Sequence, residues 1–185
     1  MLSGKARYGM LAGLSLGVML CFAGARADDA LEYAVKAAYL PKFIPFITWP
    51  ESSFASAAAP VNICLLGPDP FGGKLDQEAA SFKAGERPVA VRHLAEFDPQ
   101  APCQLLFVGA GADPALVDGA LDAIKGKPVV TVTDSGLKRH GVISFVIEAD
   151  HVRFDIDDAE AGEDGLVISS KLLALAHSVH QRGQP

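Results

Sequence analysis

Apolar positions in residues 28–185 form two kinds of segment, short continuous runs and stretches with helical spacing. Continuous runs, typical of strands buried on both faces, occupy residues 61–66, 104–108 and 128–133. Helical patterns, some opening with an acidic cap or a proline, occupy residues 31–40, 71–80 and 113–125. Strands alternating with helices predict an α/β fold of three layers, in which a mainly parallel mixed sheet carries helices on both faces.

The last third of the chain has a different pattern. Residues 141–148 and 151–156 are strand-like runs separated only by Ala149 and Asp150, which is the spacing of a two-residue hairpin. We therefore expect an antiparallel hairpin at the edge of the sheet. An apolar stripe that includes Leu172, Leu175 and Val179 predicts a final helix over residues 171–180. No repeat or linker divides the chain, so a single domain over residues 28–185 is expected.

The first predicted helix has Leu31, Ala34, Val35 and Ala38 on its apolar face. Prolines at positions 41 and 45 predict a break or a kink in its continuation, because proline removes a backbone donor and clashes with the preceding turn.

Residues 1–27 have the three parts of a secretory signal peptide: a basic start, an apolar run and the exit Ala25-Arg26-Ala27. The apolar run of about sixteen residues is shorter than the roughly 20 that span a bilayer, which disfavours a retained membrane anchor. Cys21 follows Leu20 rather than a small residue, which disfavours a lipoprotein. We expect cleavage after Ala27.

Cleavage changes the charge balance of the chain. The full sequence of 185 residues has 16 Lys+Arg, 22 Asp+Glu and a formal net charge of −6. Residues 1–27 contain Lys5, Arg7, Arg26 and no acidic residue, so the mature chain has a net charge of −9. An acidic chain with no second apolar stretch of spanning length predicts a soluble periplasmic protein, and its charge argues against nucleic acid as the partner.

Two cysteines, Cys64 and Cys103, remain after cleavage, and each lies in or next to a predicted buried strand. Neighbouring strands would bring the two sulfur atoms together, and the alternative is a pair of buried free thiols. Export to an oxidising compartment favours the disulfide.

The sequence motifs of common enzymes are missing. There is neither a G-x-S-x-G elbow nor a phosphate-binding P-loop, and the glycines at 109 and 111 do not have the spacing of a dinucleotide-binding turn. His177 and His180 lie three residues apart on the predicted final helix, but no third metal ligand is evident, so we expect them to be solvated. We therefore expect no catalytic residue, no metal and no cofactor.

One group of residues is a candidate for binding a small anion. Ser169, Ser170 and Lys171 begin the final predicted helix, and a helix N-terminus with hydroxyl groups and an ammonium group suits a carboxylate. The alternative is that one of the two serines simply caps the helix.

Taken in order, several segments make the chain resemble the YfiR-like family of periplasmic proteins. The pieces that carry the resemblance span residues 32–176 and include Val35-Lys36-Ala37-Ala38-Tyr39-Leu40, Trp49-Pro50, Ile63-Cys64-Leu65-Leu66-Gly67, Val152-Arg153-Phe154-Asp155-Ile156 and Ile168-Ser169-Ser170-Lys171-Leu172-Leu173. The resemblance implies a compact α/β domain, often dimeric, in which Cys64 and Cys103 are oxidised to a disulfide.

The resemblance also implies a function. The best-understood member represses a YfiN-type inner-membrane diguanylate cyclase through the periplasmic domain of that enzyme, and so limits cyclic di-GMP and biofilm formation. Other relatives accompany sensor histidine kinases. Small aromatic or carboxylate-bearing ligands are implied for a pocket that matches Thr48, Trp49, Ser169 and Lys171 here.

Two hypotheses follow from the sequence. The first is a non-catalytic periplasmic regulator, expected as a homodimer, that binds the sensory domain of a membrane signalling protein. The second is a small-ligand-binding accessory of a histidine kinase, or a minor hydrolase that uses Asp134, Ser169 and Lys171.

Overall fold

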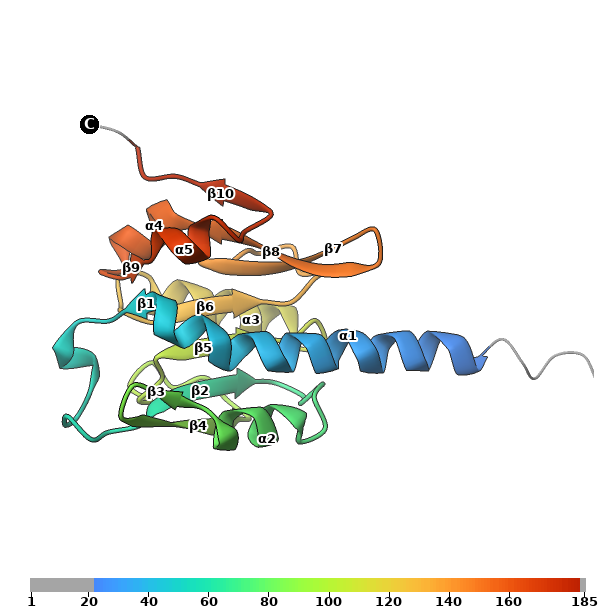
Figure 1. Ribbon diagram of the computed structural model, residues 1–185, viewed down its shortest axis with the longest axis horizontal. Coiled ribbons are helices and arrows are strands. Elements are labelled where there is room, and N and C mark those ends of the chain that lie inside the picture. Colours follow the sequence, from blue (N-terminus) through green and yellow to red (C-terminus); the bar gives the residue numbers. More distant parts are fainter. Residues whose placement is uncertain (1–21, 184–185) are drawn as a thin grey trace, which may run out of the picture.

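A mixed sheet of eight strands forms the middle layer of the computed structural model, which describes residues 22–183, with side chains from Asp28 onwards (Figure 1). Its spatial order is β10-β8-β7-β6-β5-β2-β4-β3. The strands are β2 (Val61–Leu66), β3 (Lys83–Ala84), β4 (Arg87–Leu94), β5 (Leu105–Val108), β6 (Val130–Thr133), β7 (Ile143–Glu148), β8 (His151–Asp157) and β10 (Ser178–His180). From β7 across to β4 every neighbouring pair is parallel, as the continuous apolar runs predict.

Helices cover both faces of the sheet, so the three-layer α/β prediction is confirmed. On one face, α1 (Phe22–Phe43) and α2 (Lys74–Ser81) pack against Val61, Ile63 and Leu65 of β2. On the other face, α3 (Pro114–Ile124) packs against Cys64 and Leu66 of the same strand. Successive side chains of β2 therefore enter different layers, which explains why the whole strand is apolar.

The predicted hairpin is present, and one more strand lies outside it. Strands β7 and β8 pair antiparallel, and Ala149 and Asp150 both have positive φ angles, 47° and 61°, as a tight two-residue turn requires. The short strand β10 then pairs in parallel with β8, so the outermost strand on this side is β10.

The predicted final helix over residues 171–180 is wrong. Helix α5 (Ser170–Leu173) is only one turn long, and the chain then turns and becomes extended in β10. Of the apolar stripe, only Leu172 is buried, so the stripe supplies too little apolar burial to hold a longer helix against the domain.

Helix α1 differs from its prediction in two ways. It continues past Pro41 to Phe43 and then tightens into a short 3-10 helix (Ile44–Phe46), so the proline lies within the last turn instead of ending the helix. The face that packs on the sheet contains Lys36, Ala37, Leu40 and Phe43, whereas Leu31 on the predicted apolar face is exposed.

Shorter elements complete the domain. Strand β1 (Ile47–Thr48) pairs antiparallel with β9 (Val167–Ile168) in a small separate sheet. A 3-10 turn (Glu51–Ser53) follows β1, and helix α4 (Asp158–Glu163) follows β8 directly.

The predicted signal peptide lies mostly outside the described residues. Residues 1–21 are not described, and α1 begins at Phe22 and continues across the predicted cleavage position after Ala27. Within residues 22–183, none of the helices combines the length and the apolar character that crossing a membrane requires.

Candidate functional site

The four predicted ligand-binding residues lie on two neighbouring segments of the chain. Strand β1 places Thr48 opposite Val167 of β9, and the Ser169 N–H donates to the carbonyl oxygen of Phe46 at 2.8 Å. Thr48, Trp49 and Ser169 are therefore brought to one side of the domain.

Structural roles already occupy two of these four side chains. The Trp49 indole N–H donates to the Gln104 carbonyl oxygen at 3.1 Å, which ties the segment after β1 to the start of β5. The Ser169 hydroxyl accepts from the Lys171 N–H at 3.3 Å and caps α5, which was the alternative reading of this serine. Lys171 is exposed. Ligand binding by these residues stays a prediction.

Asp134 lies at the other end of the sheet from this region. Gln104, the partner of Trp49, comes just before β5, whereas Asp134 comes just after β6, which runs parallel to β5. The two levels are separated by roughly 16 Å at 3.3 Å per residue. The structure therefore does not bring Asp134 together with the segment that contains Trp49 and Ser169.

Asp134 belongs instead to a buried charge cluster, which we define as Glu32, Tyr33, Lys36, Asp134 and Ser135. The Lys36 ammonium group forms ion pairs with both Glu32 and Asp134 and donates to the Ser135 hydroxyl at 2.9 Å. The Tyr33 hydroxyl donates to Asp134 at 2.8 Å. Two backbone N–H groups, of Ala110 at 3.2 Å and Ser135 at 2.9 Å, also donate to the Asp134 carboxylate.

Burial makes this cluster unusual. Lys36 and the side chain of Asp134 are fully buried, and Glu32 is partly exposed. Burial, together with the hydrogen bond to Asp134, raises the pKa of Tyr33 far above its ordinary value, so its hydroxyl stays a donor. Three residues of α1 are thereby fixed over the carboxyl ends of β5 and β6, where α/β sheets commonly bind ligands.

The buried charge cluster was not predicted from the sequence. The only local signal was the spacing of Glu32 and Lys36, four residues apart on a predicted helix, which is usually a surface pair. The decisive partner, Asp134, is 98 residues further along the chain from Lys36.

A groove runs between the outward face of α1 and the β7–β8 hairpin, and we call it the α1 groove. Its main hollow has a volume of about 790 Å³. A second hollow of about 400 Å³ continues it along α1 and shares Val35 and Tyr39 with it. The main hollow is lined by Asp28, Leu31, Glu32, Val35, Tyr39, Ile147, Asp150, His151, Val152 and Arg153.

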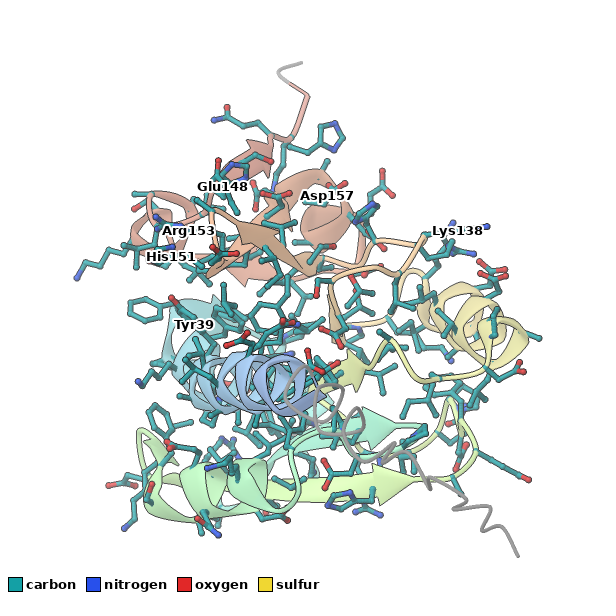
Figure 2. All side chains as sticks on the ribbon, turned by 90° about the vertical axis from the view of Figure 1, so that its right-hand side faces the viewer. Tyr39, Lys138, Glu148, His151, Arg153 and Asp157 are labelled. Carbon is teal, nitrogen blue, oxygen red and sulfur yellow. A yellow bond between two sulfur atoms is a disulfide. The ribbon has the colours of Figure 1, made fainter. Side chains whose placement is uncertain are left out.

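The α1 groove combines an apolar floor with charged margins. Leu31 is 66% exposed and Ile147 is 44% exposed, which is unusual for large apolar side chains. In Figure 2, Tyr39 of α1 lies below His151 and Arg153 of β8. The charged residues that line the hollow are Asp28 and Glu32 of α1 and Asp150, His151 and Arg153 of the hairpin. Apolar surface with a polar rim is typical of protein interaction sites.

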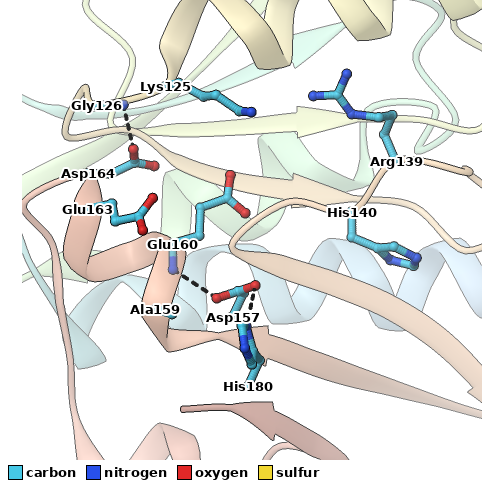
Figure 3. Close-up of a pocket in the computed structure, with 10 residues that line it drawn as sticks. All are labelled: Lys125, Gly126, Arg139, His140, Asp157, Ala159, Glu160, Glu163, Asp164 and His180. Carbon is cyan, nitrogen blue, oxygen red and sulfur yellow. Dashed lines mark hydrogen bonds and ion pairs between the residues drawn. The ribbon is translucent and has the colours of Figure 1, made fainter. Parts of the chain in front are cut away.

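A third hollow, of about 390 Å³, lies beside α4 and is strongly charged (Figure 3). Burial and neighbouring carboxylates raise the pKa of Glu160, and burial raises the pKa of Asp164. Burial acts in the same direction on Asp157, but hydrogen bonds from the Glu160 N–H and from His180 outweigh it and lower the pKa of that carboxyl. Among the residues described, no three His, Cys, Asp or Glu side chains are arranged to hold a metal ion.

Cys64 and Cys103 form a disulfide with their Cα atoms 5.8 Å apart. The bond joins β2 to the residues that lead into β5, within the layer covered by α3. A buried disulfide of this kind fits an oxidising compartment.

The match to a family agrees with this architecture. A family model described as YfiR/HmsC-like matches residues 33–177, which is most of the described chain. The protein belongs to the YfiR/HmsC-like family. No curated protein matches the sequence. The matched range includes the disulfide, β1, β9 and most of the buried charge cluster, and it begins at Tyr33 of α1. Proteins of this family are generally regulatory rather than catalytic.

Proposed function

We propose that the protein is a non-catalytic periplasmic regulator that binds and restrains the periplasmic sensory domain of an inner-membrane diguanylate cyclase. In this proposal residues 1–27 are removed on export, and the mature chain acts without a cofactor as a homodimer. Family membership and the disulfide support the regulatory role and the compartment.

The observation that carries the proposal is the α1 groove. A catalytic site needs a reactive group held in reach of a substrate. The side chains of Lys36 and Asp134 are fully buried and form an ion pair with each other, so neither is in reach of a substrate. The α1 groove instead offers exposed Leu31 and Ile147 between charged margins. Such a surface suits a protein partner, because apolar anchors at the centre of an interface supply most of its binding energy.

The test is capture of the partner from membranes. Tagged mature protein, kept oxidised, is mixed with a detergent extract of membranes from the source organism, and captured proteins are identified by mass spectrometry. We expect a diguanylate cyclase with a periplasmic sensory domain to be recovered. Leu31→Asp and Ile147→Asp place a charge in the apolar floor, and each should reduce recovery by about tenfold or more.

The matched control is Val167→Asp. Val167 is also a large exposed apolar residue, 56% exposed, but it lies on β9 outside the α1 groove. It should leave recovery unchanged. Recovery of no signalling protein, or equal recovery by all the variants, would contradict the proposal, and recovery of a histidine kinase instead would overturn the choice of partner class.

A further inference from the structure

The outer edge of β8 is only partly covered. Strand β8 runs from His151 to Asp157, but β10 pairs only with residues 155–157. One further bond joins the His177 N–H to the Phe154 carbonyl oxygen at 2.8 Å. Within the described residues, no strand pairs with the outer side of residues 151–153, so this half of β8 presents unpaired backbone groups.

Strand β10 buries little of its own surface. Ser178 and His180 are exposed, and Val179 is only half-buried. The strand therefore gains little from apolar packing and depends on backbone hydrogen bonds and on side-chain charge pairs. A segment held in this way is among the first parts of a protein to open.

Four charge pairs connect this C-terminal segment to β7, β8 and α4. His177 Nδ1 lies 3.0 Å from Asp155, and its Nε2 lies 3.4 Å from Glu148 of β7. His180 Nδ1 lies 2.9 Å from Asp157. Arg182 Nε and Nη2 lie 2.9 and 3.1 Å from the two carboxylate oxygens of Asp158, in a bidentate pair.

Other charged groups surround the two histidines. The charges that face His177 come from β7 and β8, as Glu148 and Asp155. His180 faces Asp157 and also borders the charged hollow of Figure 3, whose other titratable or charged lining residues are Lys125, Arg139, His140, Glu160, Glu163 and Asp164.

Both histidines are expected to respond to pH in the same direction. The hydrogen bond to Asp155 and the charge of Glu148 raise the pKa of His177, and the hydrogen bond to Asp157 raises the pKa of His180. A raised pKa means that folding favours the charged imidazole. The stabilisation is complete below the ordinary histidine pKa of 6.5 and is lost as the pH rises through the folded-state value.

We propose that β10 is a removable edge strand whose departure opens the outer edge of β8, from His151 to Asp157, to an extended segment of the partner protein. The proposal rests on the proposed function only in taking the partner to be a protein. A free sheet edge binds an extended chain because that chain supplies the missing backbone donors and acceptors.

The side chains of β8 indicate what the incoming segment should contain. Asp155 and Asp157 lie two residues apart and so project from the same face of the strand. The protein's own C-terminal segment places an imidazole against each of them. A segment with basic residues at alternate positions would make the same contacts, so the partner segment is expected to be extended and positively charged.

A peptide tests whether the edge accepts a strand. The probe is a peptide of residues 175–183 with both histidines replaced by glutamine, amidated at its C-terminus and carrying at its N-terminal amine, through an amide bond, a dye that does not titrate between pH 6 and 8, so that its own charge does not change over this range. Binding to the full mature protein is measured by fluorescence anisotropy. Wild type at pH 6 should bind weakly, because the attached β10 competes at a high effective concentration.

One variant and one control set the expected pattern at pH 6. Ser178→Pro removes an N–H that the register of β10 points toward β8, and it should bind the peptide at least about tenfold more tightly than wild type. Ala84→Pro makes the same change in β3, at the opposite edge of the sheet, and should behave as wild type. Equal peptide affinity for folded Ser178→Pro and wild type would overturn the proposal, as would tighter binding by Ala84→Pro.

The pH dependence gives a second and independent test. Wild type should bind the peptide about three- to tenfold more tightly at pH 8 than at pH 6, because neutral histidines hold β10 less firmly. His177→Gln/His180→Gln should show no such dependence. A pH dependence that survives in this variant, or none in wild type, would overturn the role of the histidines. Neither test uses the membrane partner, so failure here is distinct from failure of the proposed function.

Discussion

The two ends of the described chain are both attached to the sheet by charged side chains, but in opposite surroundings. Helix α1 is attached through Lys36 and Asp134, whose side chains are fully buried. Strand β10 is attached through His177, His180 and Arg182, which are all at least 40% exposed. The N-terminal helix also packs aromatic rings on the sheet, with the Phe43 and Phe154 centroids 5.0 Å apart, whereas β10 has no such anchor among the described contacts.

The difference shows what burial does to an ion pair. Buried charges are costly to separate, because removing one partner leaves the other without compensation in a medium of low polarity. Exposed charges are rehydrated when a pair opens, so such a pair contributes little and is easily lost. The same side-chain chemistry therefore fixes α1 in place and leaves β10 removable.

The largest effect is expected from breaking the fixed attachment. Lys36→Met keeps most of the side-chain volume but leaves Asp134 buried without its counter-ion. The free energy of unfolding should fall by about 3–5 kcal/mol, as measured by urea denaturation.

Lys42→Met is the matched control, since Lys42 lies on the same helix and is exposed. It should change stability by no more than about 0.5 kcal/mol. Lys36→Met/Asp134→Asn removes both charges and should recover part of the loss. A Lys36→Met protein as stable as wild type would show that the buried charge cluster does not anchor α1.

The next largest effect concerns the centre of the sheet. Cys64 and Cys103 close a separation of 39 residues, so reduction should destabilise the protein by about 4 kcal/mol in the chain-entropy model. Thermal unfolding with and without a reductant measures this loss. Cys64→Ala/Cys103→Ala should unfold at the same temperature with and without reductant. If the reductant did not lower the unfolding temperature of the wild-type protein, the expectation would be contradicted.

The central strands and helix α3 were predictable because the sequence pattern of each segment agrees with its place in the packed domain. The continuous apolar runs at β2, β5 and β6 are typical of strands that are covered on both faces, and all three strands are buried in this way. Helix α3 begins where the sequence indicates, with the Asp113 carboxylate accepting from two backbone N–H groups at its start and proline at the first position.

The attachments at the two ends could not be predicted in the same way. The apolar positions of α1 predicted that the face containing Leu31 packs on the sheet. The face containing Lys36 packs there instead, because Lys36 forms an ion pair with Asp134, a buried residue far away in the chain. The C-terminal stripe indicated a helix, but the chain bends at His177 and then pairs with β8 as β10, which brings His177 and His180 to Asp155 and Asp157. The spacing of apolar residues predicts a helix and its apolar face, but it does not show which charged residues from distant parts of the chain pair with that segment.

The predicted ligand-binding residues show the same limit. Thr48, Trp49 and Ser169 lie on neighbouring segments, but ligand binding by them stays a prediction. The α1 groove was not foreseen, because it is formed by an outward helix face and a hairpin that lie more than a hundred residues apart in the sequence.

The most direct test of this account is hydrogen exchange of both attachments in one sample at pH 6 and pH 8. After correction for intrinsic exchange rates, protection of the β10 amides should be about three- to tenfold lower at pH 8, while protection around Lys36 in α1 stays constant. Equal protection of β10 at the two pH values, or a parallel loss in α1, would contradict the claim that one end of the chain is fixed and the other is removable.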